Sequence, residues 1–460
     1  MRLDLISPLL ILLVGAVLTL LVGIFLPRDK QRWNAGLALL VLGAAGVAAL
    51  TLRGTHALIF DGSFVVDEAT VWTQLMLFAT AAASILLAIP VFRNDAREGE
   101  FYSLLLFTVI GTVVLAGAAD MMEIVLGVLL SSIGGYVLVA YRRSDPLALE
   151  AVLKYYLVGA LTNMALIFGF ALLYGLSGST QLGTMGEQLA PGSTLLLSIA
   201  VVLVLVGIGF KAGFVPAHFW MPDALQAAST PVAALLSVAP KLAALLALAH
   251  VMEALPLARI DWPLVLAIIA AVTMSWGNLA AWRQENLQRL LAYSSISQSG
   301  YMLLALVALP DSSLALPALL FYFAAYLAAN FGAFAVVGAL GKPNICDGAG
   351  LARRHPLLAL SMAVSLLSLM GLPPLAGFVG KFLLFTVAFE AHYEWLAILA
   401  ALNSVLSLYY YLRVIAPMYL QPPAYAGKPE PWAVIVAAVS ALASLLLGLG
   451  VYLFLDFPAT

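Results

Sequence analysis

Cysteine is almost absent from this sequence, and charged residues are scarce. Its 460 residues include a single cysteine, Cys346, which excludes an internal disulfide and any metal or iron–sulfur site built from cysteines alone. The sequence also contains no Cys/His cluster, P-loop or Rossmann glycine pattern, so we expect no cofactor, nucleotide or metal in this chain. The formal net charge of −2 argues against a nucleic-acid partner.

Hydrophobic residues make up 63% of the chain and charged residues only 10%. A soluble domain carries about 25% charged residues, so this composition predicts an all-α membrane protein that crosses the bilayer many times. Fourteen apolar runs approach the ~20 residues that a helix needs to cross a bilayer. They cover residues 5–26, 33–52, 69–92, 101–118, 121–141, 149–175, 193–214, 231–252, 262–282, 291–309, 314–340, 357–388, 394–412 and 431–455. The first run has no small-residue cleavage site, so we expect it to be retained as a helix.

Basic residues divide unequally between the loops. The loops after odd-numbered spans hold fourteen lysines and arginines, whereas the N-terminus and the loops after even-numbered spans hold three, Arg2, Arg53 and Arg259. Because the richer side faces the cytoplasm, we predict both termini on the outer face of the membrane. The other four of the 21 basic residues fall inside predicted spans. They are Lys154, Lys211, Lys241 and Lys381.

Two of these lysines lie in the stretch 202–246, on either side of a segment with Pro216 and His218. A lysine inside a membrane span costs roughly 2.5 kcal/mol or more, so its default interpretation is functional. Pro240 directly precedes Lys241. Proline interrupts a helix, which membrane proteins tolerate where the backbone is buried in protein or lines a cavity. Ionisable groups beside interrupted helices indicate an ion pathway.

Buried amines suit proton transfer. Burial lowers the pKa of an ammonium group, which then exchanges protons near neutral pH, where a free lysine does not. A row of such groups can pass protons from one to the next. His218 suits the same work because an imidazole titrates near pH ~6.5. Glu123, near the start of the fifth span, is a further candidate.

Each candidate also has a purely structural interpretation. Lys154 can extend its side chain to the interface from a helix end. Lys381 follows a run rich in glycine and proline, so it can also belong to a loop that splits its span. His218 can be a hydrogen-bonded loop residue, and Glu123 can face the interface together with Asp120.

A short motif occurs twice. The sequence GFV follows Lys211 at 213–215 and precedes Lys381 at 377–379, with proline nearby in both places. The two spans are five apart, and an odd offset inverts the orientation of a repeat in the membrane. Inverted repeats with interrupted helices at matching positions are typical of transporters.

Longer segments resemble one known family, the antiporter-like proton-channel subunits of respiratory complex I. The resemblance rests on KAGFVPAHFWMPDALQAASTPV, APK, GNLAAWRQENLQRLLAYSSISQSGY and SLMGLPPLAGFVGKF, and it covers about residues 100–420. Two more segments resemble subunit N of NADH-quinone oxidoreductase in particular, the homologue of mitochondrial subunit 2. They are LARRHPLLALSMAVSLLSL and LNSVLSLYYYLRVI.

The resemblance implies fourteen helices, two inverted five-helix repeats, and discontinuous seventh and twelfth helices. It divides the chain into an N-terminal segment 1–100, a first repeat 101–255, a second repeat 256–420 and a last helix in 421–460. It also implies that the lysines of the sixth, seventh, eighth and twelfth helices form a buried proton relay. In this sequence they are Lys154, Lys211, Lys241 and Lys381.

The function implied by the resemblance is that of a proton-translocating membrane-arm subunit of a bacterial NADH-quinone oxidoreductase in the cytoplasmic membrane. NADH, FMN, iron–sulfur clusters and quinone are then expected in partner subunits. Two alternatives remain open. One is a subunit of an Mrp-type cation/proton antiporter or a membrane-bound hydrogenase, and the other is a non-conducting subunit that braces the membrane arm.

The sequence departs from the family at two titratable positions. Leu129 stands where the family usually has the glutamate that pairs with the seventh-helix lysine, and Gln298 stands where many relatives have histidine. Glu123 lies six residues before Leu129, which is about 9 Å along a helix axis and about 120° around it. We therefore expect no direct ion pair between Lys211 and Glu123.

Overall fold

The computed structural model describes residues 4–27, 30–93, 95, 97–142, 145–189, 194–341, 344–424 and 427–451. The two ends of the chain, whose side of the membrane was predicted, lie outside these residues, as do four basic residues of the loop count. These four are Arg2, Arg28, Arg143 and Lys342.

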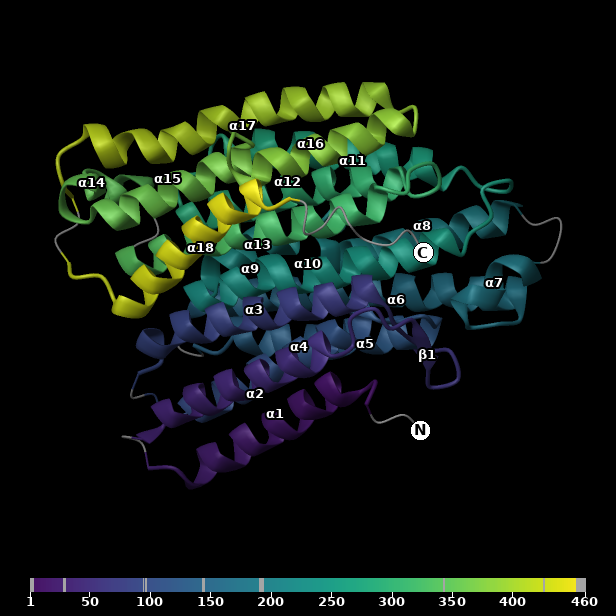
Figure 1. The fold of residues 1–460 in the computed structure, drawn as a ribbon, viewed down its shortest axis with the longest axis horizontal. Coiled ribbons are helices and arrows are strands. Elements are labelled where there is room, and N and C mark those ends of the chain that lie inside the picture. Colours follow the sequence, from purple (N-terminus) through teal and green to yellow (C-terminus); the bar gives the residue numbers. More distant parts are fainter. Residues whose placement is uncertain are drawn as a thin grey trace. The chain divides into compact units, whose positions relative to one another are not determined.

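Thirteen helices in the described part of the chain are long and apolar enough to cross a membrane (Figure 1). The chain is thus a multi-pass membrane protein, as its composition predicts. The thirteen are α1 (Ser7–Phe25), α2 (Arg32–Leu50), α3 (Glu68–Val91), α4 (Glu98–Ala116), α5 (Met121–Val139), α6 (Pro146–Ser177), α8 (Thr194–Ala212), α10 (Thr230–Glu253), α11 (Trp262–Ala281), α12 (Leu287–Val307), α13 (Ala315–Leu340), α17 (Glu394–Leu420) and α18 (Pro431–Leu449). Shorter helices are α7 (Leu182–Gln188), α9 (Trp220–Ala227), α14 (Leu351–Arg354) and the 3₁₀ helix η2 (Ile345–Gly348).

The remaining predicted span, 357–388, forms two helices of 15 residues each. They are α15 (Pro356–Met370) and α16 (Ala376–Glu390). Helix α15 ends because Gly371 has a φ of +92°, a left-handed conformation that glycine adopts without steric cost. Two prolines follow, and they cannot continue the helix. The interruption leaves the last carbonyl groups of α15 without partners inside the helix.

A second interruption follows α8. This helix ends at Ala212, and helical structure resumes at Trp220 in α9. Lys211 therefore lies in the last turn of α8, and His218 lies in the segment between the two helices.

The chain divides into two compact units. The first unit comprises Met1–Ile85, Phe92–Trp220 and Ala239–Val265. The second unit comprises Leu86–Val91, Met221–Val238 and Leu266–Thr460. The predicted inverted repeats, 101–255 and 256–420, are defined by symmetry and not by compactness, so they stay a prediction.

In the first unit, capping residues fix where α5 and α6 begin. The Asp120 carboxylate accepts the backbone N–H of Met122 at 2.7 Å, and the Asp145 carboxylate accepts that of Leu147 at 3.0 Å. Such caps satisfy backbone donors that have no partner inside the helix. Helix α5 packs on α6, and α6 packs on α8. Side chains of these three helices can therefore meet in one place.

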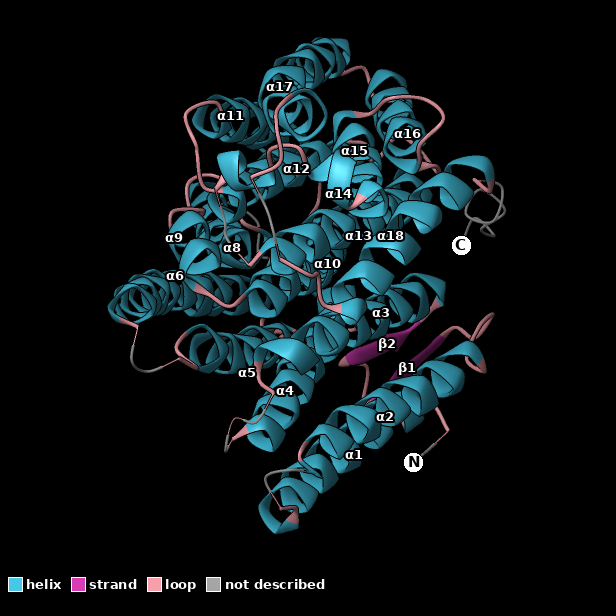
Figure 2. Ribbon diagram, turned by 90° about the vertical axis from the view of Figure 1, so that its left-hand side faces the viewer, coloured by secondary structure: helices cyan, strands magenta, loops and turns pink. Residues whose placement is uncertain are grey.

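A β-hairpin in the first unit, which the sequence analysis does not predict, joins α2 to α3. Its strands β1 (Ala57–Ile59) and β2 (Phe64–Val66) are antiparallel, and they are the only strands of the described residues (Figure 2). Phe64, Val66 and Leu52 belong to a small buried apolar cluster. The hairpin thus packs through apolar side chains, and its strands contribute no titratable group to the predicted relay.

In the second unit, α12 combines a polar sequence with almost complete burial. All its residues except Arg289 and Tyr293 are buried, although it is the least apolar of the thirteen candidate spans. It packs against α13, α16 and α17. Several polar side chains of α12 find hydrogen-bond partners on neighbouring helices instead of in water, namely those of Ser294, Ser295, Gln298 and Tyr301.

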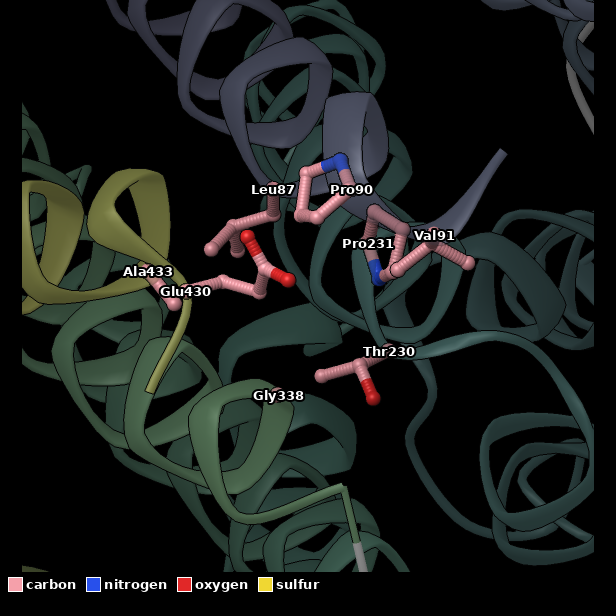
Figure 3. A pocket seen from close by; sticks show the side chains of 8 residues that line it. All are labelled: Leu87, Pro90, Val91, Thr230, Pro231, Gly338, Glu430 and Ala433. Carbon is pink, nitrogen blue, oxygen red and sulfur yellow. The ribbon is translucent and has the colours of Figure 1, made fainter. Parts of the chain in front are cut away.

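A small pocket in the second unit lies among the ends of several helices. Figure 3 shows the Glu430 carboxylate pointing toward Pro90 and Pro231. The lining residues are Leu87, Pro90, Val91, Thr230, Pro231, Gly338, Glu430 and Ala433. Glu430 is the one titratable side chain among these eight, so the pocket offers no second group with which it could exchange a proton.

Candidate functional site

Three of the four predicted lysines are enclosed by protein. Lys211 and Lys241 are 0% exposed and Lys381 is 3% exposed. Lys241 lies in α10 directly after Pro240. His218 is buried as well, with 3% exposure, and its ring packs on that of Phe219 at 4.4 Å. These four residues therefore meet the first requirement of a buried proton path, exclusion from bulk water.

Lys154 does not meet that requirement. Its side chain is 47% exposed, and its Nζ lies 2.7 Å from Oε1 of Glu150, four residues earlier on α6. The expectation of a buried lysine at this position, which came from the family resemblance, is wrong for this chain taken alone. Lys154 lies near the start of a 32-residue helix, where its flexible side chain can reach outward to a carboxylate.

Lys381 is held by the interrupted helix next to it. Its Nζ donates to the Met370 carbonyl at 3.1 Å and to Ser404 Oγ at 3.1 Å. Met370 is the last residue of α15, so its carbonyl has no partner inside that helix. The C-terminal end of a helix carries a partial negative charge, which favours the ammonium form. Nζ also lies 4.2 Å from the ring centre of Tyr301.

Gln298 on α12 binds the same helix end. Its Nε2 donates to the Leu369 carbonyl at 3.3 Å and to Tyr411 Oη at 3.4 Å, and its Oε1 accepts from the Tyr322 hydroxyl. Gln298 and Lys381 thus cap neighbouring carbonyls of α15, one with a neutral amide and the other with an amine that can change its charge.

A wider network of buried hydroxyl and amide groups extends from α12 in the second unit. Ser294 Oγ lies 2.6 Å from Tyr411 Oη, and Ser295 Oγ lies 2.7 Å from Tyr326 Oη. Asn330 Nδ2 donates to Ser237 Oγ at 2.6 Å. The sequence analysis missed these residues. The signal available was the run of polar residues in SSISQSGY inside an apolar span.

Lys211 lies among aromatic rings. Its Nζ is 5.4 Å from the ring centre of Phe210 and 5.9 Å from that of Tyr155. Trp220 stacks on Tyr155 at 4.1 Å, and its indole N–H donates to the Phe210 carbonyl at 2.9 Å. Lys211 Nζ has no hydrogen-bond partner among the described residues. Its ammonium form is therefore opposed by burial, and it is supported by the faces of the rings and by the C-terminal end of α8, in whose last turn it lies.

The acidic candidate lies elsewhere on α5. Glu123 is in the first turn of that helix, and no ion pair joins it to Lys211 in the described residues. Leu129, at the position where the family has glutamate, is 37% exposed. Tyr136, two turns further along the same helix, packs on Tyr155 at 4.6 Å. A phenol of α5 thus contacts the ring cluster around Lys211.

A metal site finds no support in the described part of the chain, which holds no group of three histidine, cysteine, aspartate or glutamate side chains placed to bind an ion. The chemistry that the buried residues can perform is the binding and release of protons by amines, and their passage along hydroxyl groups.

Comparison with known proteins also indicates a membrane subunit of this kind. The family described as "NADH:quinone oxidoreductase/Mrp antiporter, TM" matches residues 118–407. NADH-quinone oxidoreductase subunit N of Trichlorobacter lovleyi is 39% identical, over 99% of this chain and 96% of that protein.

Solved structures with the same fold include a chain of respiratory complex I from Thermus thermophilus with bound aureothin. It has a TM-score of 0.84 and 35% identity, over 96% of this chain and 97% of that chain. A chain of the Mrp complex from Dietzia sp. DQ12-45-1b has a TM-score of 0.85 at 21% identity, over 99% of this chain and 96% of that chain, which shows the fold alone. With its buried lysines, interrupted helices and close relatives all in agreement, the chain belongs to the antiporter-like family of membrane subunits that includes subunit N of NADH-quinone oxidoreductase.

Proposed function

We propose that this chain is a proton-translocating membrane-arm subunit of an NADH-quinone oxidoreductase, and that it relays protons through buried lysines. The observation that supports this most directly is Lys381, a buried amine bound to the open end of an interrupted helix. Lys211 and Lys241 add two further buried amines. An amine holds or releases a proton without any cofactor, so the relay needs no redox group in this chain.

The surroundings of Lys381 distinguish its two protonation states. As an ammonium, it is attracted by the negative end of α15 and by the ring face of Tyr301. As a neutral amine, it keeps hydrogen-bonding ability but loses both of these charge interactions. A change in charge at this position therefore changes how firmly the end of α15 is held. Such coupling allows a proton to affect the structure around it.

Electron transfer then belongs to partner subunits, with NADH, FMN, iron–sulfur clusters and quinone bound there. The structural relatives are chains of multi-subunit membrane complexes, which supports a place among other membrane-arm subunits. We also place the chain in a bacterial cytoplasmic membrane with both termini outside, because basic loop residues divide fourteen to three. A reporter fused after Thr460 tests this orientation, and a cytoplasmic response would reject it.

The main test replaces the buried amines one at a time in the assembled complex. We expect Lys381→Ala, Lys211→Ala and Lys241→Ala each to lower NADH-driven proton uptake sharply in inverted membrane vesicles, while the complex still assembles. Lys428→Ala is the matched control, because Lys428 is an exposed loop lysine. Full proton uptake in all three variants would reject the proposed function.

A non-conducting subunit that braces the membrane arm is the second candidate. The observation that favours it is the lack of a hydrogen-bond acceptor for Lys211 Nζ among the described residues, since a buried charge without a partner is costly. The same experiment separates the two functions. A bracing subunit predicts that the alanine variants change the yield of the complex but not the protons taken up per NADH oxidised.

A further inference from the structure

Several buried polar atoms of the first unit have no hydrogen-bond partner among the described residues, and three of them belong to one cluster of aromatic rings. They are Lys211 Nζ, Tyr155 Oη and Tyr136 Oη. Buried polar atoms in folded proteins are almost always hydrogen-bonded, so each such atom requires an explanation. These three come from α8, α6 and α5, and α6 packs on both of the other two helices. Their gathering in one place indicates a shared role.

Ring contacts connect the three residues. Tyr155 lies between the other two, with its ring centre 5.9 Å from Lys211 Nζ and 4.6 Å from that of Tyr136 at an interplanar angle of 81°. Stacking on Trp220 fixes the plane of Tyr155. The two phenol groups are therefore held in defined orientations. A proton relay requires such fixed orientations, whereas a simple apolar contact does not.

Gly159 shows why the Tyr136 hydroxyl can enter this cluster. A Cβ atom at Gly159 would lie 1.9 Å from Tyr136 Oη and 2.8 Å from Cζ of Phe210. The hydroxyl thus rests on the bare backbone of α6, beside the ring that precedes Lys211. Ser132, one turn earlier on α5, is close enough to interact with the Tyr136 hydroxyl, but not in a geometry that satisfies it. The Ser132 hydroxyl itself donates to the Val128 carbonyl at 2.6 Å.

A carboxylate of α5 does not take this place. Thirteen residues separate Glu123 from Tyr136, which is roughly 20 Å along the helix axis. Leu129 is apolar and partly exposed. The side chains that α6 and α5 bring to this cluster, Tyr155 against Lys211 and Tyr136 against Tyr155, are neutral phenols. They can pass a proton without carrying a charge of their own.

We propose that Tyr155 and Tyr136 form a hydroxyl relay for the proton of Lys211, an inference that rests on the proposed proton-translocating function. In the first step, an N–H bond of the Lys211 ammonium breaks as an O–H bond forms on Tyr155, whose original O–H proton passes to Tyr136. In the second step, the original O–H proton of Tyr136 passes to a water molecule. Lys211 is left as a neutral amine, and both phenols end neutral. The polar atoms need not touch for this transfer, because one water can bridge two atoms up to roughly 5.5 Å apart, at about 2.8 Å for each hydrogen bond.

The test uses phenylalanine, which removes only the hydroxyl. We expect Tyr136→Phe and Tyr155→Phe to lower the protons taken up per NADH oxidised to the value of the Lys211→Ala variant, in vesicles that contain the assembled complex. In a double variant with Lys211→Ala, neither change should lower proton uptake further, because groups that act in one step are not additive. Tyr174→Phe is the matched control, since Tyr174 lies on the same helix α6 and is 50% exposed.

The outcomes separate the two proposals. Unchanged proton uptake in both phenylalanine variants, together with a low value for Lys211→Ala, would overturn the hydroxyl relay and leave the proposed function intact. A further loss in the double variants would also overturn the relay, because it would show that the phenols act apart from Lys211. Unchanged uptake in Lys211→Ala itself would count against the function of this lysine and therefore against the relay.

Discussion

Lys211 and Lys381 are both buried lysines at the interruption of a helix, yet their amines have different neighbours. Lys381 Nζ donates to two oxygen atoms, the Met370 carbonyl and Ser404 Oγ. Lys211 Nζ faces the rings of Phe210 and Tyr155 and has no acceptor among the described residues. Burial of a lysine therefore does not by itself define the chemistry of its proton.

The difference lies in how each site treats the charge. At Lys381 the end of α15 supplies an oriented dipole and a free carbonyl, so the charged form is stabilised by fixed groups. At Lys211 the rings supply about 0.5–2 kcal/mol of cation–π attraction, and protons leave along hydroxyl groups in the proposed relay. The Lys381 site therefore suits holding a proton, and the Lys211 site suits passing it on.

The largest expected effect comes from adding a methyl group at Gly377, where α16 begins beside the end of α15. A Cβ atom at Gly377 would lie 1.8 Å from the Ser368 carbonyl oxygen, so Gly377→Ala must push α16 away from the end of α15. We expect a loss of about 3 kcal/mol in stability, the upper range for overpacking, seen as early thermal inactivation of the purified complex. Gly175→Ala is the control, because nothing lies within 4 Å of its added methyl group.

Replacing each lysine by methionine tests the comparison itself. Lys381→Met leaves the Met370 carbonyl buried without its donor, which should cost about 2 kcal/mol. Lys211→Met removes a buried charge that has no acceptor and should be neutral or stabilising. Thermal unfolding of the two purified variants measures the difference in stability. A larger loss for Lys211→Met than for Lys381→Met would show that fixed groups stabilise the charge at Lys211 and not at Lys381.

Gln298 provides a smaller test at the same helix end. Gln298→Met keeps the length of the side chain but removes the donor to the Leu369 carbonyl, so we expect a loss of about 1 kcal/mol. Gln298→His keeps a ring N–H donor and should retain more of the stability and of the proton uptake. Equal loss in both variants would mean that side-chain shape, and not the hydrogen bond, holds α15.

The smallest effect is expected at the exposed pair of Lys154 and Glu150. Ion pairs between exposed residues four apart on a helix contribute about 0.3–0.5 kcal/mol, so Lys154→Ala should barely change the thermal stability of the purified complex. High salt should remove even this contribution. A loss as large as that of Lys381→Met would show that Lys154 is enclosed by a partner subunit.

The sequence predicts much of the fold because the bilayer imposes a strong rule on length and polarity. Most helices follow the apolar runs closely, and the two GFV motifs lie beside the two interruptions. The first motif follows the end of α8, and the second lies in the first turn of α16. Lys211, Lys241 and Lys381 were found because a charge inside an apolar run is conspicuous. The β-hairpin was missed because its strands are only three residues long.

The hydrogen-bond partners were harder to predict for a physical reason. Tyr411, Tyr322 and Tyr136 each count among the hydrophobic residues of the composition, so their hydroxyl groups leave no signal there. Whether a phenol meets a glutamine or a lysine depends on contacts between helices that are far apart in sequence. The exposure of Lys154 was missed for a related reason, because only the packing of α6 decides which of its faces is covered.

The enclosure of α12 has a consequence for biogenesis. This helix is almost completely buried, yet it is the least apolar of the candidate spans. Insertion from the translocon favours segments that are apolar on their own, and each strongly polar residue near the centre opposes entry into lipid. Helix α12 should therefore enter the bilayer together with its neighbours, with α13 acting as the partner that follows it out of the ribosome and covers its serine and glutamine side chains.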